Sequence, residues 1–363
     1  MPRIIHTGDI HFDTPFTSRL NRKDAELRRS EIKATFGKII SKANDADLLL
    51  IAGDLFDGGT VSVDTINFLK RKFSEIPNTR VFISAGNHDP YTPNSIYESV
   101  DFGKNVHVFG TELEYVDIAE LKTRVHGISF KTEHCGAMFK KFETADDMVN
   151  ILLIHGDVSP ILENSQYNPI TKAELSASKM DYVALGHIHK YSGIQMAENV
   201  AWAYCGIPEG RGFDEDGGRG IIEGNIEKSN VNLEFFEICH RRYFNLEVDI
   251  SEAKDELHIS EIIKESMKKV GSVNDLYKII LKGEIDQDLT IDNDFITKNL
   301  SNDAFFVEIS DCTESSYNYM EVASENSLQG RFVNSMLDTI AKLDGDEKEI
   351  AKMALEYGVK AMK

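Results

Sequence analysis

The first 243 residues alternate short apolar runs with longer amphipathic stretches. Strand-like runs lie at residues 3–7, 47–52, 81–85, 106–109, 124–129, 151–155 and 182–185. The runs at 48–51 and 151–154 are uninterrupted, as is typical of strands covered on both faces. Helical patterns at about 24–44 and 62–76 separate the early strands. Strands alternating with helices predict a mostly parallel α/β domain. Later runs at 200–205, 220–226 and 231–237 are closely spaced and indicate hairpins.

The pattern changes after residue 243. Residues 243–250, 276–285 and 305–310 alternate like half-buried strands, and 259–270 reads as an amphipathic helix. We therefore expect an α/β domain over 1–243 and a small α+β domain over 244–320. Residues 321–363 should form closing helices, at about 326–342 and 346–362. The second of these carries one apolar stripe, formed by Ile350, Met353, Ala354 and Val359.

Composition places the chain among ordinary globular proteins. Its 363 residues exceed one compact core, and 41% of them are hydrophobic. No apolar run approaches the roughly 18 residues of a membrane span, and the first residues lack a signal-peptide layout. Four cysteines lie far apart and read as reduced thiols. We expect a cytoplasmic protein with no membrane association.

The formal net charge of −20 bears on possible partners. Residues 244–363 hold 13 Lys and Arg against 25 Asp and Glu, so this part carries −12. Affinity for DNA that does not depend on base sequence comes from Lys and Arg at phosphates. A nucleic-acid function would therefore need a local patch, bound metal ions or a basic partner.

Polar clusters of one kind follow five of the predicted strands. They read Gly-Asp-Ile-His at 8–11, Gly-Asp-Leu-Phe-Asp at 53–57, Gly-Asn-His-Asp at 86–89, His-Gly-Asp at 155–157 and Gly-His-Ile-His at 186–189. The carboxyl ends of strands in α/β sheets are where ligands bind, so these clusters should converge.

The residue types of these clusters indicate a metal site. Carboxylate and amide oxygens with imidazole nitrogens, and no thiolate, suit manganese, iron or zinc. The set is too large for one ion, but it suits two ions about 3.5–4 Å apart that share a bridging carboxylate. We expect two divalent ions, manganese in the first place, with iron or zinc as alternatives.

The five motifs, in this order, resemble the calcineurin-like metallophosphoesterase superfamily. The second domain and the Gly-Asp-Leu-Phe-Asp spacing resemble the SbcD-type DNA-repair exonucleases. The glycine-rich segment 205–220 is similar to their YhaO-like bacterial branch. The resemblance implies an α/β/β/α sandwich followed by a smaller α+β capping domain and terminal helices.

The resemblance also implies a role for each motif residue. Two groups of three ligands would each hold one ion, with a bridging carboxylate between them: Asp9, His11 and His189; Asn87, His155 and His187; and Asp54 as the bridge. His88 would face the scissile phosphate and act as general acid, worth about 10²–10⁴-fold. Asp57 and Asp89 would orient imidazoles.

Other polar residues have weaker claims on the site. Arg211 and Arg219 lie in the glycine-rich segment and are candidates for contact with a phosphate backbone. His6, His107 and His126 match no motif position, so we expect them to be packed histidines.

Three functions follow from these features. The first is a manganese-dependent DNA exonuclease or endonuclease of the SbcD type, acting in DNA repair with an SMC-like SbcC-type ATPase. Such an enzyme would be a homodimer, and its closing helices would dock on the ATPase. The second is a phosphodiesterase or phosphatase acting on nucleotides or other small phosphoesters. The third, a scaffold without chemistry, is disfavoured because every motif position is filled. Cleavage polarity and the preference for exo or endo cleavage stay open.

Overall fold

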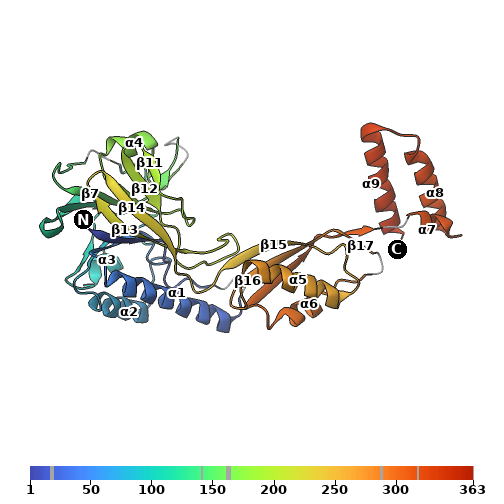
Figure 1. The fold of residues 1–363 in the computed structure, drawn as a ribbon, viewed down its shortest axis with the longest axis horizontal. Helices are drawn as coiled ribbons and strands as arrows, with labels where there is room; N and C mark the ends of the chain where they lie inside the picture. The colour runs from blue at the N-terminus through green and yellow to red at the C-terminus, as the bar shows by residue number, and fades with distance from the viewer. Residues whose placement is uncertain (17–19, 140–141, 161–164, 287–288, 317–318, 363) are drawn as a thin grey trace. The chain divides into compact units, whose positions relative to one another are not determined.

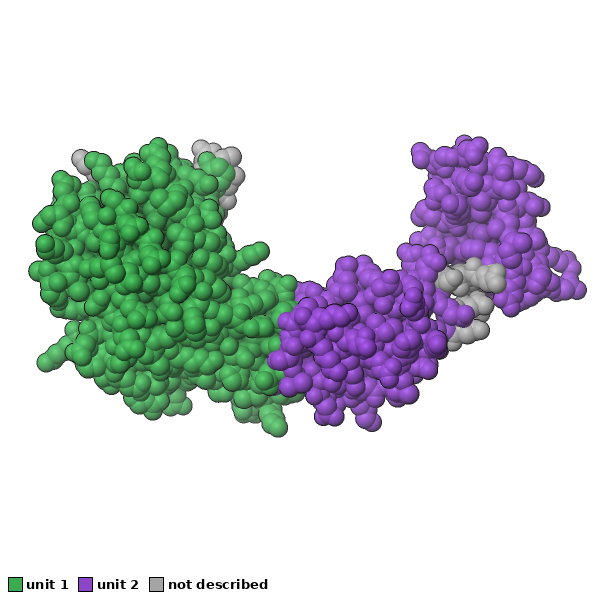
Figure 2. Space-filling view, viewed as in Figure 1, with its two compact units in different colours: residues 1–244, 274–276 green, residues 245–273, 277–363 purple. Residues whose placement is uncertain are grey.

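The computed structural model describes residues 1–363 except 17–19, 140–141, 161–164, 287–288, 317–318 and 363 (Figure 1). The described chain divides into two compact units (Figure 2), residues 1–244 with 274–276, and residues 245–273 with 277–363. The predicted division at residue 320 falls inside helix α7 (Tyr319–Ser324) and stays a prediction. Among the described residues, no helix is long and apolar enough to cross a bilayer.

Unit 1 contains two six-stranded sheets. The first has the order β14-β13-β1-β2-β3-β4, from strands β1 (Arg3–Thr7), β2 (Leu48–Ala52), β3 (Arg80–Ser84), β4 (Val106–Val108), β13 (Gly220–Glu227) and β14 (Asn230–Glu237). The second has the order β11-β12-β10-β7-β6-β5, from β5 (Glu114–Ile118), β6 (Thr123–Ile128), β7 (Val149–His155), β10 (Tyr182–Gly186), β11 (Gln195–Ala197) and β12 (Val200–Tyr204).

Each sheet has a parallel centre. Strands β1 to β4 run parallel, with the antiparallel hairpin β13–β14 added beside β1. Strands β6, β7, β10 and β12 also run parallel, with β5 and β11 antiparallel at the edges. The expected hairpin of β13 with β14 is confirmed, whereas β12 joins the parallel centre and forms a hairpin with β11 instead.

Alternating side chains of the strands fill different layers. Leu48 and Leu50 of β2 belong to the core between the two sheets, together with Ile151 and Leu153 of β7. Leu49 and Ile51 point the other way, into a core that the helices cover. The uninterrupted apolar runs thus serve two cores at once because side chains alternate across a strand.

Helices cover the outer faces of this pair of sheets. Helices α1 (Arg22–Ala43) and α2 (Val63–Ser74) lie on the first sheet, and α4 (Lys172–Ala177) packs at the second (Figure 1). The α1 helix begins where the Asn21 side chain accepts a hydrogen bond from the Asp24 amide. Short segments α3 (Ile96–Ser99), η1 (Ala119–Leu121) and the pair β8 (Asp157–Val158) and β9 (Pro169–Ile170) complete the unit. The expected α/β/β/α sandwich is confirmed.

Unit 2 begins within strand β15 (Tyr243–Asp249), which lies in a three-stranded sheet of order β15-β16-β18 with β16 (Leu276–Lys282) and β18 (Phe306–Asp311). Helix α5 (Glu256–Val270) buries Ile259, Ile263 and Met267. Helix α6 (Asn293–Leu300) and strand β19 (Glu314–Ser316) were not expected from the sequence. The single strand expected over 276–285 divides into β16 and the short β17 (Glu284–Asp286), which pairs in parallel with β19. Helix α6 is short, and only Ile296 and Leu300 are buried on it, which leaves a weak periodic signal.

The last part of unit 2 is helical. Helices α7 (Tyr319–Ser324), α8 (Leu328–Ile340) and α9 (Gly345–Ala361) pack through Val322, Val333, Leu355 and Val359. The expected stripe on the last helix divides between two faces. Val359 is buried in this cluster, whereas Ile350 and Met353 are 65% and 55% exposed.

Candidate metal centre

The loops after β1 and β2 continue to pair beyond the ends of the strands. The amide of Asp9 donates to the carbonyl oxygen of Gly53 at 2.9 Å, and the amide of His11 donates to that of Asp54 at 2.9 Å. The two loops therefore hold each other in register. This pairing fixes the backbone beneath three expected ligands without using their side chains.

Two glycines leave room for the site. Gly53 has a φ of +86°, and a Cβ there would overlap the imidazole of His155. A Cβ on Gly86 would overlap the carboxylate of Asp54. Glycine at these two positions therefore allows the backbone to approach a side chain of the site closely.

Several expected ligands occupy the left-handed backbone region. Asp9, His11, Asp54 and His187 have φ values of 49°, 51°, 48° and 107°. Residues other than glycine adopt such conformations at a cost of order 1–3 kcal/mol each. Strain concentrated on four ligand positions indicates that the surrounding fold holds them for a functional purpose.

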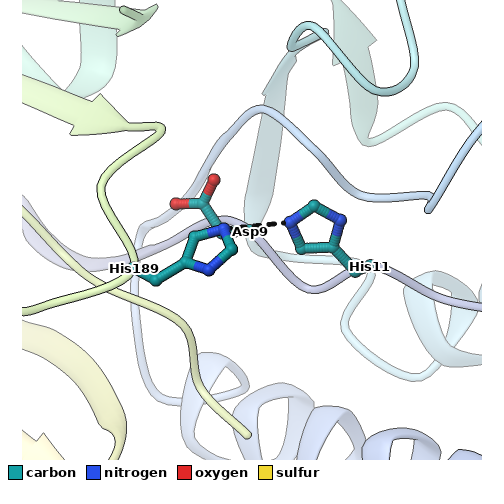
Figure 3. A group of neighbouring side chains, drawn as sticks. All are labelled: Asp9, His11 and His189. Atoms are coloured by element: carbon teal, nitrogen blue, oxygen red, sulfur yellow. Dashed lines mark hydrogen bonds between the residues drawn. The ribbon is translucent and has the colours of Figure 1, made fainter. Parts of the chain in front are cut away.

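The first group comprises Asp9, His11 and His189 (Figure 3), whose ligand atoms all lie within 4.8 Å of one another. The Nε2 atoms of His11 and His189 face each other at 3.3 Å. The Nδ1 atom of His11 faces Asp57 at 3.1 Å, and that of His189 faces Glu215 at 2.6 Å. Because carboxylates only accept, both Nδ1 atoms carry the proton, and in the neutral imidazoles both Nε2 atoms present lone pairs.

In the second group, which comprises Asn87, His155 and His187, ring nitrogens also face an atom that accepts hydrogen bonds. Nε2 of His155 and Nδ1 of His187 both point at Oδ1 of Asn87, at 2.9 and 3.2 Å. Nδ1 of His155 faces the carbonyl oxygen of Ala52 at 2.9 Å, so that nitrogen is the donor. The remaining lone pair of His155 therefore faces an amide oxygen that can only accept.

Asp54 lies between the two groups. Its Oδ2 atom is 3.8 Å from Nε2 of His11 and 3.5 Å from Nε2 of His155. A cation between these groups would satisfy the lone pairs that face one another. The donor set of oxygen and imidazole nitrogen fits divalent manganese, iron or zinc. The residues present therefore fit two divalent ions with Asp54 as the shared ligand.

Protonation in this centre follows from burial and from the carboxylates. Burial lowers the pKa of both His11 and His187 to about 4, so both imidazoles are neutral and available as ligands near pH 7. Burial raises the pKa of Asp9 to about 6, although the charge of His155 opposes the change. Burial acts to lower the pKa of His155, but the charges of Asp54 and Asp9 raise it overall. The same attraction for positive charge would serve a metal ion.

His88 and Asp57 stand beside this centre. The side chain of His88 is 46% exposed, and its Nδ1 atom is 3.4 Å from Oδ1 of Asp57. The same Asp57 oxygen contacts His11, as the expected orienting role requires. The amide of His88 donates to Oδ1 of Asp54 at 2.9 Å. The His88 ring is thus the accessible member of the cluster.

Asp89 differs from the expectation that it would steady an imidazole. Its carboxylate accepts hydrogen bonds from the amides of Gly86 and Phe56 and from the hydroxyl of Tyr97. Burial, together with the charge of Asp54, raises its pKa to about 7. Asp89 therefore ties together the two loops that carry Asp54 and Asn87.

The two arginines of the glycine-rich segment lie in different surroundings. Arg219 donates to the carbonyl oxygens of Glu215, His189 and Asp216, so its guanidinium holds the backbone. Arg211 lies within the centre, where Nη1 is 3.3 Å from Oδ1 of Asp57. Contact of Arg211 with a phosphate stays a prediction.

Sequence reasoning missed one residue of this centre, Glu215. Its carboxylate is buried against His189. Its place in an acidic, glycine-rich stretch offered no spacing signal, because 26 residues separate it from its partner.

Comparison with known proteins adds the family. A family model described as "Calcineurin-like phosphoesterase" matches residues 2–191. The chain is 27% identical over 285 residues to "Uncharacterized metallophosphoesterase YhaO" of Bacillus subtilis, covering 73% of this chain and 67% of that protein. It is 22% identical over 322 residues to "DNA double-strand break repair protein Mre11" of Methanopyrus kandleri, covering 78% and 69%.

A solved structure is also similar over part of this chain. The crystal structure of TT1561 of Thermus thermophilus aligns with a TM-score of 0.40 and 12% identity, covering 65% of this chain and 99% of that chain.

Proposed function

The chain belongs to the calcineurin-like phosphoesterase family, and we propose that it is a manganese-dependent DNA nuclease of the SbcD type acting in DNA repair. The family indicates a metal-dependent phosphoester hydrolase. The observation that carries the proposal is the arrangement of two groups of facing lone pairs around Oδ2 of Asp54. One ion in each group would share this carboxylate.

Each part of the centre would contribute one element of hydrolysis. When bound, the ions would supply Lewis acidity toward the phosphoryl oxygens and activate water. His88 would donate a proton to the leaving oxygen, since its half-exposed ring lies at the edge of the ligand cluster. Asp57 would hold His11 and His88 in place through one shared oxygen.

Two observations support DNA as the proposed substrate: the similarity to one relative, and the presence of the second unit. The Mre11 protein of Methanopyrus kandleri is named for repair of DNA double-strand breaks, and its alignment covers 78% of this chain. The aligned part of this chain is longer than unit 1, so the similarity extends into unit 2. A capping unit over residues 244–320 would restrict which DNA ends reach the centre.

An SMC-like ATPase of the SbcC type would supply what this acidic chain lacks. The net charge of −20 gives little attraction to DNA, so a basic partner would provide it. Helix α9 exposes Ile350, Met353 and Tyr357 to 65%, 55% and 68%, and their spacing places them on one side of the helix. We propose that this side docks on the ATPase. Ile350→Asp combined with Met353→Asp should abolish copurification with the ATPase, and Lys352→Asp should not.

The SbcD-type resemblance also supports a homodimer formed through the phosphoesterase domain. Light scattering on the purified chain should give twice the mass of 40.8 kDa. A monomer at concentrations of tens of micromolar would exclude this part of the proposal.

Purified chain assayed with manganese on linear duplex DNA, single-stranded DNA and bis-p-nitrophenyl phosphate tests the function. Cleavage of DNA, lost in Asp54→Asn, is the expected result. Strong turnover of the small ester with no DNA cleavage, with and without the ATPase, would instead favour a phosphodiesterase of nucleotides or other small phosphoesters. The net charge of −20 is the observation that favours this second candidate.

A further inference from the structure

The segment 205–220 leaves strand β12 and returns at strand β13, passing beside the metal centre. Glu215 lies in this segment and is 4% exposed. A buried carboxylate is costly unless cations or hydrogen bonds compensate it. The contacts of Glu215 therefore show which groups compensate the burial of its carboxylate and indicate its role.

Both carboxylate oxygens of Glu215 are engaged. Oε1 lies 2.6 Å from Nδ1 of His189 and 3.7 Å from Nε of Arg211. Oε2 accepts a hydrogen bond from the backbone amide of Arg211. The carboxylate is thus held on one side by its own segment and presents the other oxygen to the imidazole.

The backbone around Glu215 is fixed to the backbone of the same histidine. The guanidinium of Arg219 donates from Nη1 to the carbonyl oxygen of His189 at 3.1 Å and from Nε to that of Glu215 at 3.3 Å. The amide of Ile207 also donates to the His189 carbonyl, at 3.0 Å. One cation therefore sets the separation between the two chain segments that carry the carboxylate and the imidazole.

The start of the segment is anchored in the interior. Glu209 is 1% exposed, and it accepts hydrogen bonds from Arg28 at 2.8 Å and from the hydroxyl of Thr35 at 2.7 Å. Both donors lie on helix α1. The segment is therefore held at Glu209 and at Arg219, with Glu215 between them.

We propose that Glu215 is a positioning residue of the metal centre, which holds Nδ1–H of His189 so that its Nε2 lone pair faces the ion shared with Asp9 and His11. The proposal rests on the metal-dependent function proposed above. A carboxylate behind a ligand imidazole fixes its tautomer and ring orientation and makes it a stronger donor. Without Glu215, the ring could rotate or present the protonated nitrogen to the ion.

The two ions should then differ in their dependence on carboxylates. His11 and His189 are backed by Asp57 and Glu215, whereas His155 is backed by the carbonyl oxygen of Ala52. Loss of Glu215 should therefore weaken the ion of the first group and leave the ion held by Asn87, His155 and His187. This selectivity separates positioning of one ligand from a general loosening of the fold.

The test compares Glu215→Ala and Glu215→Gln with Asp214→Asn, an exposed neighbour with the same change of charge. Manganese binding is measured by calorimetry and by metal analysis after desalting. Cobalt absorption spectra report the coordination of each ion, and thermal unfolding without metal reports the fold. We expect wild type and Asp214→Asn to bind two ions. In Glu215→Ala one ion should bind about 10–100-fold more weakly, and the other should be unchanged.

The affinity of Glu215→Gln for the weakened ion should lie between those of wild type and Glu215→Ala, because its amide oxygen can still accept Nδ1–H of His189. Two ions bound to Glu215→Ala with wild-type affinities and an unchanged cobalt spectrum would overturn the proposal. Equal weakening of both ions together with a lowered unfolding temperature would also overturn it, as would an equal effect of Asp214→Asn. None of these measurements uses a substrate, so a failure to cleave DNA would leave the result on Glu215 intact.

Discussion

Replacement of His88 by alanine separates the chemistry of the centre from its metal binding. The ring contributes little to the fold, because it is 46% exposed and its contact with Asp57 is 3.4 Å long. Even an ionic contact at this exposure contributes only about 0–1 kcal/mol, so the free energy of unfolding of the variant should change by no more than that. The amide of residue 88, which donates to Asp54, is kept in the variant. Two ions should therefore still bind.

The loss of catalysis should be much larger than the loss of stability. General-acid catalysis contributes about 10²–10⁴-fold, which corresponds to about 3–5 kcal/mol of transition-state stabilisation. The loss should depend on the leaving group. A DNA alkoxide needs the proton, whereas p-nitrophenolate leaves without it. We expect the wild-type to variant ratio of kcat to be at least tenfold greater on DNA than on bis-p-nitrophenyl phosphate.

Metal analysis and both assays on the same preparation complete the test. His107→Ala is the matched control, since its side chain is 39% exposed and no motif includes it. Equal losses on the two substrates would contradict a proton donor at His88. Loss of one ion from the variant would contradict the separation of roles.

Three further predictions concern the metals, a glycine and a buried histidine. Ions present at 100 times their Kd each stabilise the fold by about 2.7 kcal/mol, so EDTA should lower the Tm by roughly 10 °C or more, and manganese should restore it; an unchanged Tm would exclude metal binding. Gly86→Ala places a Cβ on Asp54 and should reduce activity at least about 100-fold, whereas Gly59→Ala, which meets no atom within 4 Å, should retain it; equal activities would contradict the close approach. Burial lowers the pKa of His6 from 6.5 to about 3, so below pH 6.5 the unfolded chain takes up a proton that the folded chain refuses. As the pH falls from 6.5 towards 3, the free energy of unfolding should therefore decrease by about 1.4 kcal/mol per pH unit. In urea unfolding, His6→Gln should remove this part of the pH dependence. An unchanged pH dependence would contradict the burial of a neutral imidazole.

Much of the local structure was readable along the chain. Strands β1, β2, β3, β7 and β10 lie within a residue or two of the predicted runs, because uninterrupted apolar stretches bounded by glycine are a strong signal. Edge strands β5 and β11 were missed. In β5, four of the five residues are at least partly exposed, so its composition resembles a loop.

The candidate site divides in the same way. The seven expected ligands, each placed after an apolar strand, converge as the motifs predicted. Asp89 was expected at the site but with other partners, and Glu215 was not expected there, since the partners of both residues are set by the course of loops. Asp89 is next to His88 in sequence, yet it bonds to the backbone of Phe56 and Gly86.

The sequence by itself determined the residue types of the candidate metal centre, their order, and their positions at the ends of strands. An apolar run states that both faces of a strand are covered, but it does not state what covers them. Only the tertiary structure decided that Leu48 and Leu50 meet a second sheet while Leu49 and Ile51 meet helices. It also decided that Glu215 supports His189, because a contact between segments 26 residues apart depends on the path of the chain and leaves no periodic trace.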